Sequence, residues 1–63
     1  MNEEIKAAQE AIDRSINDLQ NDLATNPNVS LEAFQQSFND LEIERQMIKD
    51  SIVVFFNFLN SQE

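Results

Sequence analysis

A single proline, Pro27, divides the chain into two stretches in which apolar residues recur at every third or fourth position. This spacing places the apolar side chains on one face of an α-helix. Proline cannot continue a helix interior, and the residue before it is pushed out of the helical conformation, so the first helix should end near Asn26. A short connection between two amphipathic helices favours an antiparallel hairpin.

The first expected helix covers about residues 3–24. Its apolar face is formed by Ile5, Ala8, Ile12, Ile16, Leu19 and Leu23. After a turn at 25–30, Ser30 serves as N-cap of a second expected helix over about residues 31–60. Its apolar positions alternate in steps of three and four, the heptad spacing of a coiled-coil seam. They are Leu31, Phe34, Phe38, Leu41, Ile48, Ile52, Phe55 and Leu59. We therefore predict an all-α fold, a two-helix antiparallel hairpin with a coiled-coil-like seam, in one domain over residues 1–63 with helix 2 longer than helix 1.

Arg45 occupies a seam position at which the heptad calls for an apolar residue. Two interpretations remain open. Its aliphatic stem can pack on the seam while the guanidinium reaches water or an acid. Alternatively, the charge selects the register or the partner. If the chain folds back about residues 27–28, Glu10 lies opposite Arg45, which favours the first interpretation.

The end of the second helix carries more apolar residues than the seam can use. The second helix is about eight residues longer than the first, so beyond about Val54 it has no residue of the first helix opposite it. From Met47 to Leu59 it is apolar nearly all round, which is typical of a helix buried on every side. A hairpin alone cannot bury such a helix, and exposed apolar surface of this size usually marks a protein interface.

The heptad divides this apolar end between the seam and a second face. Ile52, Phe55 and Leu59 continue the seam, while four neighbours point elsewhere: Val53, Val54, Phe56 and Phe58. The candidate interface residues are Ile43, Met47, Val53, Val54, Phe55, Phe56, Phe58 and Leu59. The surface could be covered by a different protein, which we favour, or by a second copy in a homodimeric four-helix bundle. It could also be a β-strand, because Ile, Val and Phe favour strands, although a lone strand would have no hairpin partner.

The composition argues against several kinds of binding site, partner and catalytic function. The chain has no Cys, His or Gly, which argues against disulfides, Cys/His zinc sites and phosphate-cradling loops. A net charge of −8 argues against nucleic acids and anionic membrane surfaces as partners. The acids lack calcium-loop spacing, and the serines lack a histidine base. We therefore expect no enzyme, metal, cofactor or small-molecule substrate. Because the acidic start is unlike a secretory signal and the longest apolar run is too short to span a bilayer, we expect a cytoplasmic protein.

Several segments resemble the second helix of the small needle-protein chaperones of bacterial type III secretion systems. They are Phe34-Gln35-Gln36, Leu41-Glu42 and Ile52-Val53-Val54-Phe55-Phe56-Asn57-Phe58, and the resemblance covers roughly Ser30 to Asn60. It implies a cytoplasmic, non-catalytic chaperone that pairs with a larger, tetratricopeptide-like one. Together they would keep the needle subunit monomeric until export, with the apolar end of the second helix docking on the larger chaperone.

Other segments are similar to the needle subunit itself. They are Asn26-Pro27-Asn28, Leu31-Glu32-Ala33-Phe34-Gln35, Arg45-Gln46 and Val53-Val54-Phe55. This second resemblance implies a self-assembling structural subunit. A third hypothesis rests on the acidic residues of both helices, which could mimic DNA phosphate in a phage-encoded inhibitor that binds a host protein.

Overall fold

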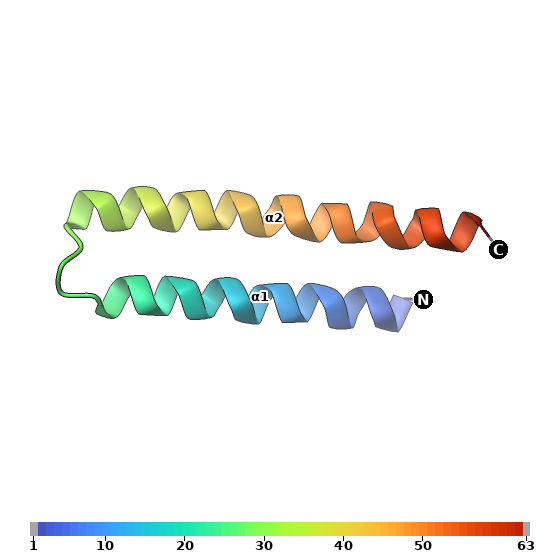
Figure 1. The fold of residues 1–63 in the computed structure, drawn as a ribbon, viewed down its shortest axis with the longest axis horizontal. Coiled ribbons are helices and arrows are strands. Elements are labelled where there is room, and N and C mark those ends of the chain that lie inside the picture. The colour runs from blue at the N-terminus through green and yellow to red at the C-terminus, as the bar shows by residue number, and fades with distance from the viewer. Residues whose placement is uncertain (1, 63) are drawn as a thin grey trace.

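The computed structural model describes residues 2–62 and consists of two antiparallel α-helices (Figure 1). Helix α1 spans Asn2–Thr25 and helix α2 spans Leu31–Ser61. Together they form a rod with extents of 50 × 16 × 11 Å. The predicted all-α hairpin with a longer second helix is confirmed, and its helix bounds agree with the prediction to within one residue. The alternative of a strand in the apolar C-terminal stretch is wrong, because residues 52–59 lie within α2.

Side chains of the turn hold the two helices in place. The backbone N–H of Asn28 donates to Asn26 Oδ1 at 2.9 Å, which stabilises the bend on either side of Pro27. Ser30 has an extended backbone, with φ −70° and ψ 159°, and its Oγ accepts from the N–H of Ala33 at 3.2 Å. This is the geometry of an N-cap, so α2 begins where the sequence predicted it.

Very little of the hairpin is fully buried. Among the described residues, only Ile16 and Gln20 are buried, with 5% and 7% of their surface exposed. Ile16 is a predicted core residue, but Gln20 is not. It takes the inner position that was expected for Leu19, which is 51% exposed. The inner face of α1 thus continues from Ile16 to Gln20, four residues later, rather than to Leu19, three residues later.

The inner face of α2 departs from the predicted heptad seam. Half-buried residues lie at positions 38, 41, 45, 49, 52 and 56, in steps that average the 3.6 residues per turn of a straight helix. A heptad repeat has 3.5 residues per turn, and a straight helix drifts from it by about 20° per heptad. The drift accumulates toward the C-terminus. Phe55, assigned to the seam, is therefore exposed, whereas Leu59 is exposed because it lies past the end of α1. Val53 and Phe56, expected to point elsewhere, are half-buried on the side of α1.

Hydrogen bonds between the helices define their register. Gln9 Nε2 donates to the carbonyl of Lys49 at 3.4 Å, and Arg45 Nη1 donates to Asp13 Oδ1 at 2.8 Å. Facing residue numbers thus add to 58 rather than the expected 55, because the turn is centred at about residue 29, one to two residues later than the expected 27–28. The expected pair of Glu10 and Arg45 is wrong. In this register α1 reaches about residue 56, so α2 extends beyond it by a shorter segment than predicted (Figure 1).

Candidate protein-interaction surface

Six polar residues, three from each helix, meet between the helices in the middle of the hairpin. This polar cluster consists of Asp13, Asn17, Gln20, Glu42, Arg45 and Lys49. Arg45 lies at its centre, with 17% of its side chain exposed. Its position on the inner face of α2 follows from the helical spacing, and α1 supplies acceptors for its two Nη atoms, while its buried Nε has no hydrogen-bond partner among residues 2–62.

The Arg45 guanidinium donates hydrogen bonds in several directions. Nη1 contacts Asp13 Oδ1 at 2.8 Å. Nη2 contacts Asn17 Oδ1 at 2.6 Å and Gln20 Oε1 at 3.1 Å. The same Nη2 lies 3.1 Å from Glu42 Oε1, the atom that also accepts from Gln20 Nε2 at 2.7 Å. The buried Gln20 is thus paired through both its oxygen and its nitrogen, which explains why a polar side chain is tolerated at this inner position.

The contacts around Arg45 shift the ionisation of three groups. Hydrogen bonds from Arg45 and then Lys49, whose Nζ lies 3.1 Å from Asp13 Oδ2, lower the pKa of Asp13. The hydrogen bond from Gln20 and the charge of Arg45 lower the pKa of Glu42. The hydrogen bond to Asp13 is the main cause that raises the pKa of Arg45. All three groups therefore remain charged at neutral pH, and together with Lys49 they form two acids balanced by two cations within the hairpin.

These contacts distinguish between the two interpretations of Arg45. Its head reaches an acid, as the first interpretation expects, although the acid is Asp13 rather than Glu10. Asn17 and Gln20 were missed at the sequence level because a polar residue in an amphipathic helix is ordinarily placed on the solvent side. The position of Gln20, four residues after Ile16 on the same face, is the signal that could have identified it. Within residues 2–62, no group of three or more His, Cys, Asp or Glu side chains is arranged to hold a metal ion.

Away from the polar cluster, α2 exposes apolar side chains to solvent. Seven large ones between positions 43 and 59 are exposed, and we call them the outer face: Ile43, Met47, Ile48, Val54, Phe55, Phe58 and Leu59. Exposure reaches 69% for Val54, 57% for Phe55 and 58% for Phe58. These three residues line a shallow groove of about 460 Å³ with Asp50 and Ser51.

The helical geometry keeps part of the outer face out of reach of α1. With 100° of rotation per residue, Met47 and Val54 lie about half a turn around the helix axis from Arg45, which contacts α1. Because α1 occupies the side of Arg45, no side chain of α1 can cover residues on the far side. Within residues 2–62 there is no other helix that could bury them.

The structure divides the eight predicted interface residues into two groups. Six of them belong to the outer face: Ile43, Met47, Val54, Phe55, Phe58 and Leu59. Val53 and Phe56 do not, because they are half-buried on the α1 side. Ile48, assigned to the seam, is exposed and joins the outer face. The drift of a straight helix relative to the heptad accounts for each of these exchanges.

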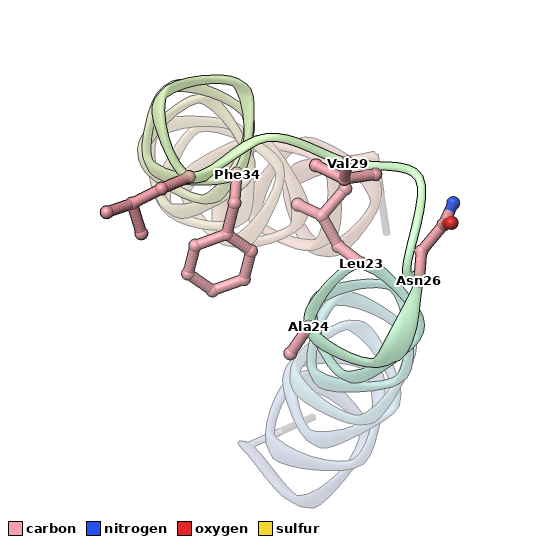
Figure 2. A pocket seen from close by; sticks show the side chains of 6 residues that line it. Leu23, Ala24, Asn26, Val29 and Phe34 are labelled. Atoms are coloured by element: carbon pink, nitrogen blue, oxygen red, sulfur yellow. The ribbon is translucent and has the colours of Figure 1, made fainter.

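A second hollow lies beside the turn, at the opposite end of the hairpin from the chain termini (Figure 2). Figure 2 shows Leu23 pointing toward Val29, and Phe34 extending into the space between the two helix ends. The hollow measures about 360 Å³ and is lined by Leu23, Ala24, Asn26, Val29, Leu31 and Phe34. Because Leu23 of α1 points toward Val29 of the turn there, we assign this hollow a structural role.

The chain matches none of the protein-family models, curated proteins or solved structures with which it was compared. Over residues 2–62, neither helix combines the length and the apolar character needed to cross a bilayer. The outer face of α2 is therefore the feature from which a function can be inferred.

Proposed function

We propose that the protein is a non-catalytic interaction module that binds another protein through the outer face of α2. The observation that carries this proposal is the exposure of seven large apolar side chains on one side of one helix. Covering a Phe or Leu side chain completely stabilises a complex by roughly 1.5–3 kcal/mol, so an uncovered face of this size favours association.

The exposed area of the chain supports the same conclusion. The hairpin exposes 4874 Å². A folded monomer of 7.3 kDa ordinarily exposes roughly 4,200 Å². The excess of roughly 700 Å² is close to the ~800 Å² that each partner buries in a protein complex of standard size.

In its specific form, we propose a cytoplasmic chaperone component of a bacterial type III secretion system. The module would dock on a larger, tetratricopeptide-like chaperone and help to keep a needle subunit unpolymerised. Two features support this form. The C-terminal part of α2 contains the segment that resembles the needle-protein chaperones, and an amphipathic helix with an exposed apolar face suits binding in an apolar groove.

Co-expression with the needle subunit and the tetratricopeptide-like chaperone encoded in the same genome tests this form. The measurement is the fraction of needle subunit that elutes as a monomer in gel filtration. We expect the chain to raise this fraction and Phe58→Asp to abolish the effect. Leu31→Asp is the matched control, because Leu31 is also exposed but lies outside the outer face. If the needle subunit polymerises equally with and without the chain, the chaperone assignment is wrong.

A second candidate function is self-association, as a needle-like subunit or as a homodimeric bundle. It is favoured by the arrangement of the outer face, because its apolar residues would lie against apolar residues of a second copy packed on the same face.

A further inference from the structure

The outer face of α2 is arranged symmetrically about Ser51. Exposed apolar residues lie three, four and eight positions away on both sides of it: Ile48 and Val54, Met47 and Phe55, Ile43 and Leu59. Six of the seven outer-face residues thus form three pairs around one small side chain. Phe58 is the remaining member, and its counterpart is Glu44.

This symmetry is what a twofold interface requires. In such an interface the same patch is used by both subunits, so residue i contacts residue j of the partner copy while j contacts i. When two antiparallel α2 helices cross at Ser51, facing residue numbers add to 102. Each of the three pairs then places an apolar side chain against an apolar side chain. We propose that a second copy of this chain covers the outer face, which gives a four-helix bundle with its twofold axis at Ser51.

Ser51 is suited to the centre of such a contact. Its hydroxyl donates to the carbonyl of Met47 in its own helix at 2.9 Å, so burial does not leave it without a partner. Its small side chain also allows the helices to approach each other. Beside it lies the groove that Val54, Phe55 and Phe58 line, which a large side chain of the second copy can fill.

Charge does not oppose this pairing where the contact is made. Although the chain carries a net charge of −8, residues 51–62 contain no charged side chain. Residues 51–59 of each copy face residues 43–51 of the other, so no charged side chain of one copy lies opposite a charged side chain of the other. Glu44 faces Phe58 at the edge of the contact, where its long side chain can extend to water. The hairpin also exposes roughly 700 Å² more than a compact monomer of its mass, which is comparable to the ~800 Å² that each partner buries in an interface of standard size.

The inference rests on the proposed function in one respect, because both use the outer face. A second copy occupies this face when no other partner does, and a different partner displaces it. The two proposals fail separately. A monomeric chain would overturn the dimer without touching the docking of another protein, and a needle subunit that polymerises unhindered would overturn the chaperone assignment without touching the dimer.

Single cysteines test the symmetry directly, because the natural chain has none. Ser51→Cys and Ser61→Cys are matched, since both serines are exposed on α2 and donate to a carbonyl of their own helix. Antiparallel packing about Ser51 brings the two sulfurs introduced at position 51 together and separates the two copies of position 61 by roughly 30 Å. With a short thiol-to-thiol cross-linker we expect a covalent dimer from the Ser51→Cys variant and none from the Ser61→Cys variant. Equal yields, or a higher yield from Ser61→Cys, would overturn the proposed packing.

The mass of the purified chain in solution tests the dimer itself. Gel filtration with light scattering should give twice the monomer mass of 7.3 kDa. Phe55→Asp should raise the dissociation constant by more than about 100-fold, because it places a carboxylate against apolar side chains. Leu31→Asp should leave the constant unchanged. A wild-type chain that remains monomeric up to about 1 mM would overturn the proposal.

Discussion

The two sides of α2 differ less in polarity than is usual, because the side toward α1 combines Phe38, Leu41, Ile52 and Phe56 with two charged residues, while large apolar residues face solvent. The side turned toward α1 carries Arg45 and Lys49, which are hydrogen-bonded to Asp13. The side turned toward solvent carries Val54, Phe55 and Phe58. In most helices of soluble proteins the charged residues face water and the phenylalanines face the neighbouring helix. Such a distribution is expected if a second molecule covers the outer face, as we propose.

The assignment of the two sides of α2 is tested most directly by introducing an aspartate on each side in turn. Phe56→Asp, on the α1 side, should lower the free energy of unfolding by about 2–4 kcal/mol, because it places a carboxylate between the helices. Phe58→Asp, on the outer face, should change it by less than about 0.5 kcal/mol while association is lost. Thermal unfolding followed by circular dichroism on dilute, monomeric protein measures both. Equal destabilisation by the two variants would contradict the assignment of faces.

A smaller effect is expected from removing the charge at the centre of the polar cluster. Arg45→Met keeps a stem that can pack, but it leaves Asp13 and Glu42 without their cation. The melting temperature should fall, because a carboxylate between the helices loses its partner. Arg14→Met is the control, since Arg14 is exposed on α1.

A double-mutant cycle identifies the cause of that loss. If the loss comes from the uncompensated acid, adding Asp13→Asn to Arg45→Met should cost less than it does in the wild-type chain. Additive effects of the two substitutions would show that Arg45 and Asp13 contribute independently, contrary to their 2.8 Å contact.

The smallest effect is a change of stability with pH. The pKa of Asp13 and of Glu42 lies below the ordinary values of 3.8 and 4.5 in the folded chain. Their contribution is therefore complete above these values and is lost as the pH falls through the lower, folded pKa values. The other acids also become protonated there, which relieves repulsion and acts in the opposite direction.

Comparison with Asp13→Asn separates the two contributions. The difference in melting temperature between the wild-type chain and this variant should be constant above about pH 5 and should shrink below about pH 4. A difference that does not change with pH would show that the ion pair of Asp13 does not contribute to stability.

The hairpin could be predicted because its determinants are local. The spacing of the apolar residues, the stop at Pro27 and the N-cap at Ser30 each act over a few residues, and the structure contains all three. The exposed apolar surface on the end of α2 also followed from the number of apolar residues there, and six of the eight residues predicted to form an interface are exposed.

The faces of the last turns of α2 could not be predicted with the same accuracy. A heptad and a straight helix assign the same side to Phe38 and Leu41, but they differ at Phe55 and Phe56 because a small angular difference accumulates. The pairing of Arg45 with Asp13 depended on where the turn is centred, and a change of one or two residues there shifts every pair. The inner position of Gln20 depends on its contacts with the other helix, which hydropathy alone does not describe.

The polar cluster also determines the axial position of one helix relative to the other. Aliphatic side chains are nearly interchangeable, so one helix could slide by a turn along the other at little cost in apolar contact. Such a slip would carry Arg45 about 5.4 Å away from Asp13. The cluster therefore fixes the register of the two helices. By fixing one point in the middle of the hairpin, it sets how far α2 reaches beyond α1, and so where Phe58 and Leu59 stand relative to the start of the chain.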